Sequence, residues 1–196
     1  MADRHPLWRL HPAERRRLAG LETGLSRLVT LLGAECTGKS TLAKALARDL
    51  GAGLVTEYLR EWCAAHGRTP QRQEQAHIAA EQAARIEAAA LRHELVVCDT
   101  TPLITALCSE HYFGDDSLTA AALAFQRRCD LTLLCGPDLP WQADGFMRDG
   151  PAVRAAFDAR LRGVMQAHGL GWIDITGNDA ERRTAAIAAL QRPSSR

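Results

Sequence analysis

The sequence lacks several features that mark specialised classes of protein. Its six cysteines form no C-x-x-C pair and show no paired Cys/His spacing, which argues against a disulfide framework or a zinc site. No apolar run approaches the length of a membrane span. The N-terminus carries Asp3, Arg4 and Arg9 without a long apolar core, so it does not resemble a secretory signal. We therefore expect a cytoplasmic protein with no membrane partner.

A strong charge of one sign is also lacking. The 24 basic and 23 acidic residues leave a formal net charge of +1. Binding to a phosphate backbone requires a clustered basic surface, and the one dense basic run, 15–17, is better explained as a solvated helix face. No nucleic-acid partner is expected. A chain of 196 residues with 46% hydrophobic residues can bury a core of its own.

The most informative stretch present is the apolar run 28–32 followed by G-x-x-x-x-G-K-S at 33–40 and by a helix-forming run. A strand before and a helix after are the context that a P-loop requires, whereas a plain glycine turn is the alternative. Glycines let successive N–H groups turn toward phosphate oxygens, and the helix adds the positive end of its dipole. The stretch predicts binding of ATP through Gly33, Glu35, Cys36, Thr37, Gly38, Lys39, Ser40 and Thr41.

Two of these residues have specific expected roles. Lys39 would contact the β- and γ-phosphates of the nucleotide, and the Ser40 hydroxyl would ligate Mg²⁺. The loop by itself establishes the phosphate donor and leaves the acceptor open.

The rest of the chain predicts an α/β fold. Residues 1–25 are interpreted as an N-terminal extension and 26–196 as one P-loop domain. Strands are predicted at 28–32, 53–57, 94–99, 131–135 and 172–175, and helices after each of them, including a long one opening at 69–70 and running to about residue 93. This alternation predicts the three-layer P-loop NTPase fold, a five-stranded parallel sheet with helices on both faces.

Two carboxylates fall at predicted strand ends, where ligands of such sheets bind. Asp99 closes the third strand in the Walker-B arrangement and would hold Mg²⁺; capping the next helix is its alternative role, although Thr100 and Thr101 suit that better. Glu57 closes the second strand and could take a proton from an acceptor hydroxyl, with Arg60 one turn on; a surface salt bridge is the alternative. Which carboxylate is the base stays open.

The segment 137–154, called the lid segment below, joins a strand to a helix and has glycine flanks. Kinases must exclude water, and a closing segment with arginines does this while stabilising charge, so Arg148 and Arg154 are candidate catalytic residues; a solvated helix is the alternative. Tyr58 and Trp141 lie near strand ends, where an aromatic is more often core, but a flat cationic substrate would bind such a face. Asn178 follows the fifth strand, where P-loop kinases usually bind adenine through backbone contacts.

Four stretches together resemble a known family. Residues 33–42, 57–61, 98–105 and 140–145 are similar to the G-x-E-S-S-G-K-S-T-L, E-Y-x-R-[DE], D-T-D-x-x-T-T and P-W-x-x-D-G elements of the ribosylnicotinamide kinase domain of NadR-type NAD salvage proteins. The resemblance covers about 27–190. It implies ATP- and Mg²⁺-dependent phosphorylation of the 5′-hydroxyl of nicotinamide riboside, with Glu57, Tyr58, Arg60, Asp99, Trp141 and Asp144 at the substrate.

The sequence departs from the family pattern at several positions. Cys36 and Thr37 replace two serines, Thr101 stands where a second aspartate is common, and Arg148 lies one residue later than in D-G-x-R. Residues 1–25 are too few for an adenylyltransferase domain, so another protein is expected to adenylylate the product. A P-loop regulatory ATPase and a kinase of a different nucleoside are the alternatives, and oligomeric state is not indicated.

Overall fold

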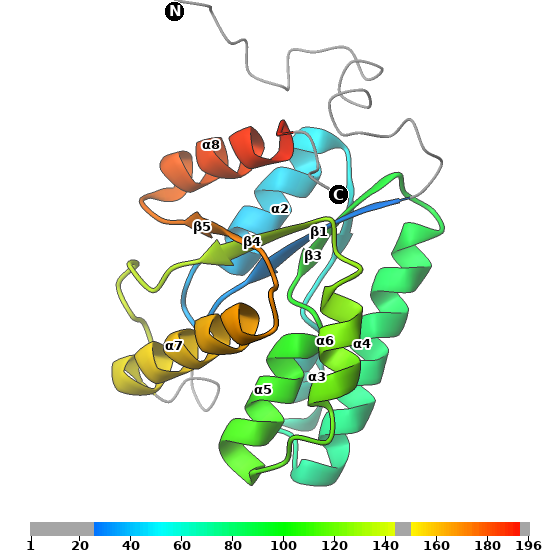
Figure 1. The fold of residues 1–196 in the computed structure, drawn as a ribbon, viewed down its shortest axis with the longest axis vertical. Helices are drawn as coiled ribbons and strands as arrows, with labels where there is room; N and C mark the ends of the chain where they lie inside the picture. Colours follow the sequence, from blue (N-terminus) through cyan, green and yellow to red (C-terminus); the bar gives the residue numbers. More distant parts are fainter. Residues whose placement is uncertain (1–25, 144–149, 193–196) are drawn as a thin grey trace, which may run out of the picture.

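The computed structural model describes residues 26–143 and 150–192. In these residues a parallel sheet alternates with helices (Figure 1). The strands are β1 (Arg27–Leu32), β2 (Gly53–Val55), β3 (Leu95–Asp99), β4 (Leu131–Cys135) and β5 (Ile173–Ile175). The helices are α2 (Lys39–Leu50), α3 (Tyr58–His66), the 3₁₀ turn η3 (Arg72–Glu74), α4 (Gln75–Ala90), α5 (Pro102–Phe113), α6 (Thr119–Gln126), α7 (Pro151–Ala167) and α8 (Asp179–Leu190).

The strand order is β2-β3-β1-β4-β5, and all four pairings are parallel. The strand that carries the P-loop, β1, is therefore central. Its Leu31 lies opposite Asp99 of β3, so Asp99 lies beside the start of the loop. The predicted five-stranded parallel sheet of the P-loop NTPase fold is confirmed.

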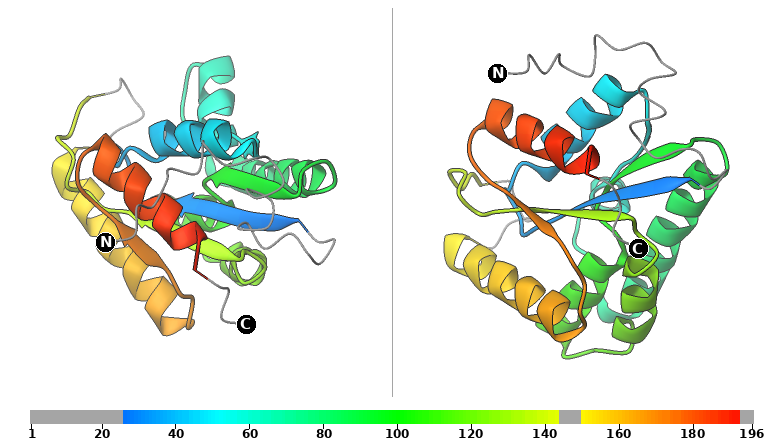
Figure 2. Two further views of the ribbon diagram at one scale, coloured as in Figure 1. Left: turned by 90° about the horizontal axis from the view of Figure 1, so that it is seen from above. Right: turned by 45° about the horizontal axis from the view of Figure 1, so that its top comes forward.

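Helices cover both faces of the sheet, as Figures 1 and 2 show. Helices α2 and α8 pack on one face through a core that includes Val29, Leu31 and Leu46. Helices α4 to α7 lie on the other face, against Leu32 and the rest of the opposite side of the strands. Strands buried on both sides have the continuous apolar sequences that were observed in the chain.

Three boundaries differ by two residues or more from those predicted. Strand β2 ends at Val55, and Glu57 becomes the residue before α3 instead of the end of the strand. The long helix does not open at 69–70, because Gln71 and Glu74 form a capping box around η3 and α4 begins only at Gln75. The helix also ends earlier, at Ala90. The capping box is a local set of hydrogen bonds, which the helical period of the sequence does not reveal.

The six cysteines are free thiols, and Cys63, Cys98 and Cys135 are buried. Burial raises the pKa of the Cys135 thiol to about 11 and that of Cys129 to about 12. These two thiols therefore stay protonated near neutral pH and behave as small apolar groups.

Within the described part of the chain, no helix has both the length and the apolar character needed to cross a membrane. The predicted extension 1–25 lies outside the described residues.

Candidate nucleotide and acceptor site

The loop between β1 and α2 has the tight backbone that phosphate binding requires. Gly33 has φ 144°, and a Cβ there would lie 2.5 Å from the Cys135 carbonyl oxygen. Gly38 has φ 76° and caps α2, and a Cβ there would lie 2.9 Å from a Leu139 methyl. Both positions therefore exclude a side chain. Helix α2 begins at Lys39, so the N-terminal end of the helix dipole is placed at the loop.

Side chains of the loop hold its own backbone. Thr37 Oγ1 donates to the Ala34 carbonyl at 2.9 Å, and Lys39 Nζ donates to the same oxygen at 2.6 Å. The lysine ammonium group therefore lies over the concave side of the loop, where a phosphate would meet it. Ser40 and Thr41 follow in the first turn of α2, with Ser40 half-buried and Thr41 exposed.

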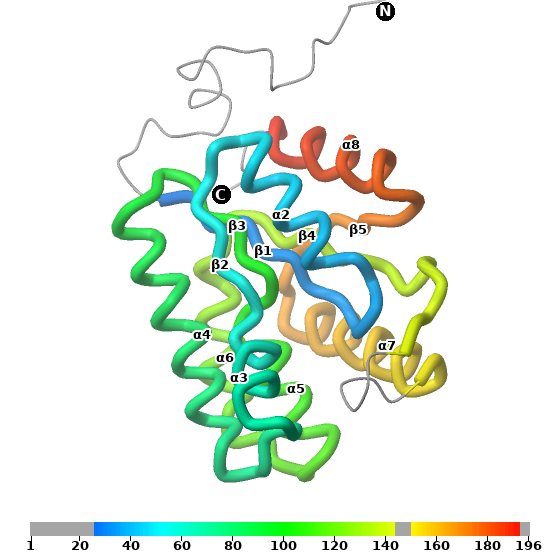
Figure 3. The backbone as a smooth tube through the Cα atoms, turned by 180° about the vertical axis from the view of Figure 1, so that it is seen from behind, coloured from blue at the N-terminus to red at the C-terminus, as the bar shows by residue number. Residues whose placement is uncertain are grey.

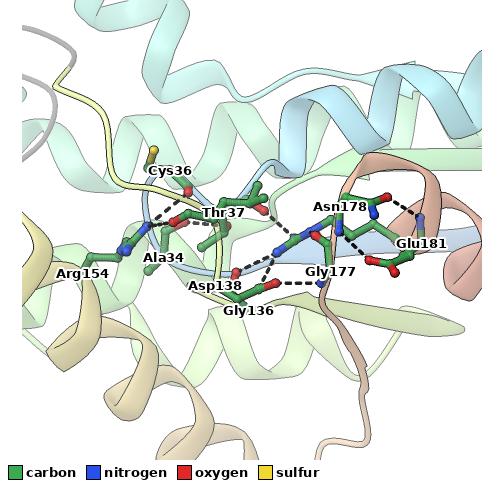
Figure 4. A network of polar contacts seen from close by, with 11 residues as sticks. Ala34, Cys36, Thr37, Gly136, Asp138, Arg154, Gly177, Asn178 and Glu181 are labelled. Atoms are coloured by element: carbon green, nitrogen blue, oxygen red, sulfur yellow. Dashed lines mark hydrogen bonds and ion pairs between the residues drawn. The ribbon is translucent and has the colours of Figure 1, made fainter.

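A buried arginine binds the loop to the neighbouring strand ends; Figure 4 labels its partners Thr37, Gly136, Asp138 and Gly177. Arg182, on α8 and 1% exposed, donates to the carbonyls of Thr37 at 2.8 Å, Gly136 at 3.2 Å and Gly177 at 2.6 Å. It also pairs with Asp138, which accepts from the Gly177 N–H at 2.7 Å. We call Arg182 and Asp138 the loop clamp.

The charge state of the clamp follows from these contacts. Partial burial acts to raise the pKa of Asp138, but the Gly177 N–H and the Arg182 guanidinium outweigh it and hold that pKa below the ordinary value. Asp138 is therefore ionised near neutral pH. The clamp ties three loops, after β1, β4 and β5, into one edge of the site.

Asp99 and Thr100 carry unpartnered polar atoms beside the loop. Asp99 is 3% exposed, and its Oδ1 has no hydrogen-bond partner among the described residues; the same holds for Thr100 Oγ1. Thr100 has φ 77°, and its N–H donates to the Leu31 carbonyl at 3.1 Å. Among the described residues, the non-glycine positions with positive φ are Thr100 and Cys36, both in this site. Backbone strain of this kind concentrates at functional sites.

These orphaned oxygens fit the predicted magnesium site. A buried carboxylate oxygen without a partner is costly unless a ligand or ion completes it. Asp99 Oδ1 at the end of β3 and the Ser40 hydroxyl in the first turn of α2 are oxygen donors, the type that Mg²⁺ prefers. The metal assignment itself stays a prediction.

Glu57 lies just before α3, in the turn that follows β2. Its side chain is 17% exposed, and Oε2 lies 3.8 Å from Arg60 Nε. Burial raises the pKa of Glu57; the charge of Lys39 opposes this shift, and that of Asp99 adds to it. The carboxylate is therefore within electrostatic reach of both Lys39 and Asp99. The sequence predictions at Glu57, Lys39 and Asp99 converge on one place, and a purely surface salt bridge does not describe Glu57.

The two predicted aromatic residues lie in different settings. The Tyr58 hydroxyl lies 3.2 Å from His77 Nε2, and the Arg85 guanidinium carbon lies 4.3 Å from the centre of the Tyr58 ring. Trp141 donates its indole N–H to Glu35 Oε1 at 2.8 Å. One face of Tyr58 is thus covered by a cation, and Trp141 is tied to the P-loop.

The P-loop also holds both flanks of the lid segment. Glu35 Oε1 accepts from Trp141 and, at 3.4 Å, from the Gly150 N–H. Arg154 donates to the carbonyls of Leu139 at 2.8 Å and Cys36 at 3.5 Å, as Figure 4 partly shows. Arg154 therefore braces backbone here, and its predicted role in charge stabilisation stays untested. Asp144 and Arg148 lie outside the described residues.

Thr101 and Asn178 each cap a helix through their side chains. Thr101 Oγ1 accepts from the Leu103 N–H at 3.4 Å and donates to the buried Gln126 at 2.7 Å, so its role as a helix cap is confirmed. Asn178 Oδ1 accepts from the N–H groups of Ala180 and Glu181 and caps α8. A contact of Asn178 with adenine through its backbone remains a prediction.

Comparison with known proteins identifies the family. The model of AAA_28, an AAA domain family, matches residues 28–183. The chain belongs to this family. This AAA domain is 28% identical to the trifunctional NAD biosynthesis/regulator protein NadR of Salmonella typhimurium. The alignment spans 163 residues and covers 80% of the chain and 40% of the relative. It is 27% identical to NadR of Escherichia coli over 85% of the chain and 42% of the relative.

Solved structures show the same fold. A crystal structure of NadR with NAD and AMP-PNP superposes with a TM-score of 0.70 at 20% identity, covering 94% of the chain and 58% of that protein. A crystal structure of NadR in complex with NR superposes with a TM-score of 0.64 at 21% identity, covering 92% of the chain and 53% of that protein. Thymidylate kinase from Ehrlichia chaffeensis superposes with a TM-score of 0.56 at 16% identity, covering 84% of the chain and 98% of that protein. The AAA domain thus has the P-loop NTPase fold and resembles NadR, as the sequence motifs predicted. It spans about two-fifths of the length of its curated NadR relatives.

Sequence reasoning missed the residues that hold this AAA domain's site together. Arg182 lies in the buried stripe of α8 with Ala186 and Ala189, where an apolar side chain would be expected. Gln82 occupies a similar place in α4, and Gln126 in α6. The available signal was the same in each case: a polar residue at a core position of an amphipathic helix.

Proposed function

We propose that this AAA domain is an ATP-dependent kinase that phosphorylates the 5′-hydroxyl of nicotinamide riboside to give nicotinamide mononucleotide. The observation that supports it is the placement of Glu57, a mostly buried carboxylate at the start of α3, within electrostatic reach of Lys39 and Asp99. A domain that only binds or hydrolyses ATP does not require a carboxylate at that position. An acceptor hydroxyl placed there would lie between a proton acceptor and the transferring phosphoryl group.

The reaction assigns a role to each part of the site. The P-loop N–H groups and Lys39 bind the phosphates and stabilise charge on the γ-phosphoryl group. The 5′-oxygen forms a bond to the γ-phosphorus, the bond from that phosphorus to the β,γ-bridging oxygen breaks, and ADP leaves. The hydroxyl proton passes to a carboxylate, Glu57 or Asp99. Ser40 and Asp99 would hold Mg²⁺, which supplies charge neutralisation between the β- and γ-phosphates when bound.

The acceptor assignment draws on the NadR relatives. Their name refers to NAD biosynthesis, and one NadR structure is a complex with NR. The elements shared with that family include Glu57-Tyr58 and Pro140-Trp141. A pyridinium ring is flat and cationic, so an aromatic face such as that of Trp141 would bind it. Free buried thiols agree with action in the reducing cytoplasm, which is part of the proposal.

One experiment tests the proposal against its alternatives. ATP turnover is measured with Mg²⁺, with and without nicotinamide riboside, and the product is identified by its mass. Nicotinamide-riboside-dependent formation of the mononucleotide supports the proposal. Turnover that responds instead to another nucleoside makes the protein a kinase of that nucleoside. Turnover that no nucleoside changes makes it a regulatory ATPase and rejects the proposal.

A further inference from the structure

A buried glutamine interrupts the apolar stripe of α4. The buried residues of this helix are Gln75, Ile78, Gln82, Ile86 and Ala89, which recur every three or four positions and face the sheet and α3. Gln82 is 1% exposed, in the middle of this stripe. Burying an amide there costs free energy unless its polar atoms find partners, so its contacts explain why the position tolerates it.

The partners of Gln82 bracket the acceptor carboxylate. Gln82 Oε1 accepts from the Tyr58 N–H at 2.8 Å, and Nε2 donates to the Thr56 carbonyl at 3.4 Å. The residue between those two backbone groups is Glu57. Because β2 ends at Val55 and α3 begins at Tyr58, Thr56 and Glu57 lie between the two elements; besides the bonds from Gln82, the Thr56 hydroxyl donates to Glu61 Oε1 at 2.6 Å. Figure 3 shows α4 running alongside the segment that joins β2 to α3.

We propose that Gln82 is a positioning residue: by fixing the backbone on both sides of Glu57, it aims that carboxylate at the P-loop. The inference rests on the proposed function for its kinetic consequence, although the positioning itself does not depend on the acceptor's identity. A turn held at both ends gives Glu57 one orientation, and small displacements of a catalytic group reduce rates steeply.

The kinetic test is a double-mutant cycle. Gln82→Met keeps the length and volume of the side chain but removes both hydrogen bonds. We expect it to lower kcat with the nucleoside about tenfold and to leave the KM for ATP within about twofold, since the P-loop is untouched. In a Glu57→Gln background the same change should lower kcat less than about twofold, because Gln82 acts through Glu57. Equal losses in both backgrounds overturn the proposal.

A matched control separates positioning from simple loss of stability. Gln75 is also buried in the stripe of α4, and its Nε2 donates to the Pro70 carbonyl at 3.4 Å, away from the turn. Gln75→Met should lower Tm as Gln82→Met does but leave kcat unchanged. A tenfold loss of kcat in both variants overturns the proposal. If Gln82→Met does not fold, Gln82→Glu keeps the acceptor for Tyr58 and removes the donor to Thr56, and a wild-type kcat in that variant rejects the proposal.

A second readout needs no substrate. The carboxyl carbon of Glu57 is followed by NMR against pH in the ligand-free protein, together with hydrogen exchange of the Tyr58 amide. In Gln82→Met, Tyr58 exchange should become faster, and the Glu57 titration should move toward that of an ordinary carboxyl as the turn loosens into solvent. An unchanged Glu57 titration contradicts the proposal. If the wild type shows no nucleoside-dependent turnover, the proposed function fails while this measurement still decides the role of Gln82.

Discussion

The P-loop side of the site, which would bind the donor, and the proposed acceptor side are held in different ways. On the donor side, the buried Arg182 binds three backbone carbonyls from three separate loops and pairs with Asp138. On the proposed acceptor side, Gln82 bonds to the backbone on both sides of Glu57, and the Thr56 hydroxyl also donates to Glu61. The phosphate-binding loop is therefore tied into the core by a buried arginine and its charge partner, whereas the backbone around Glu57 is bound by a buried neutral glutamine.

This difference has a physical consequence. Hydrogen bonds that involve a charged group contribute more than neutral ones, and removing one member of a buried network leaves the others unpaired. Changes to the loop clamp should therefore lower the stability of the whole fold, whereas changes to Gln82 should mainly affect the rate. An acceptor turn held by few contacts can be altered without loss of nucleotide binding.

The largest effect is expected at Lys39. Lys39→Ala should lower turnover about 1000-fold, because it removes the cation that stabilises charge on the transferring phosphoryl group. Lys44→Ala, an exposed lysine further along the same helix, is the control and should retain wild-type turnover. The measurement is steady-state phosphoryl transfer with nucleoside and ATP. A Lys39→Ala variant with near-wild-type rates would show that the donor side has been placed wrongly.

The next effect is on Glu57 and combines activity with stability. Glu57→Gln should lower turnover about 100-fold by removing a proton acceptor. Because burial raises its pKa, folded Glu57 holds its proton more tightly than the unfolded chain does. Below the pH at which an ordinary carboxyl group titrates, burial of Glu57 therefore does not lower the free energy of unfolding. As the pH rises through the raised pKa, the buried carboxylate lowers that free energy.

The corresponding measurement is Tm against pH. The glutamine variant should have a higher Tm than the wild type at about pH 8, and the gain should vanish near about pH 4, where both side chains are neutral. A Tm difference that grows as pH falls would contradict the assigned direction. Such a result would mean that the charged form of Glu57 is stabilised by its surroundings, as that of Asp138 is in the loop clamp.

Breaking the loop clamp tests the donor side. Arg182→Met should lower the free energy of unfolding by about 3 kcal/mol, because it leaves three carbonyls and Asp138 without their buried donor. Its neighbour Arg183, which pairs with Asp49 and is more exposed, is the control; Arg183→Met should cost less than about 1 kcal/mol. Urea unfolding measures both. Equal small losses would remove the contrast between the two sides.

The smallest effect is expected at Glu35, which connects the P-loop to the flanks of the lid segment. Glu35→Ala removes the acceptor of the Trp141 and Gly150 N–H groups, and the KM for the nucleoside should rise about fivefold, the equivalent of one hydrogen bond. Glu87→Ala, which removes an exposed pair with Arg128, is the control. An unchanged KM for the nucleoside would separate Trp141 from the acceptor side.

Sequence by itself determined the fold and the donor side of this protein. Apolar runs and helical periods placed all five strands, the parallel sheet followed from their alternation with helices, and 33–40 located the nucleotide loop. Sequence also put Asp99 at the end of the third strand, and the structure pairs that strand with β1; the metal role of Asp99 stays a prediction. These features are local: each depends on residues within one element or one loop, or on rules of chain connection.

Tertiary structure alone decided how the site is held. Arg182 meets Thr37 across 145 positions of the chain, and Trp141 meets Glu35 across 106. The bond from Tyr58 to Gln82 spans 24 positions and two elements. Hydrogen bonds between distant polar groups have no period and no fixed spacing, so a single sequence shows a polar residue in an apolar stripe but not its partner. Only the packed fold brings the partners within bonding distance.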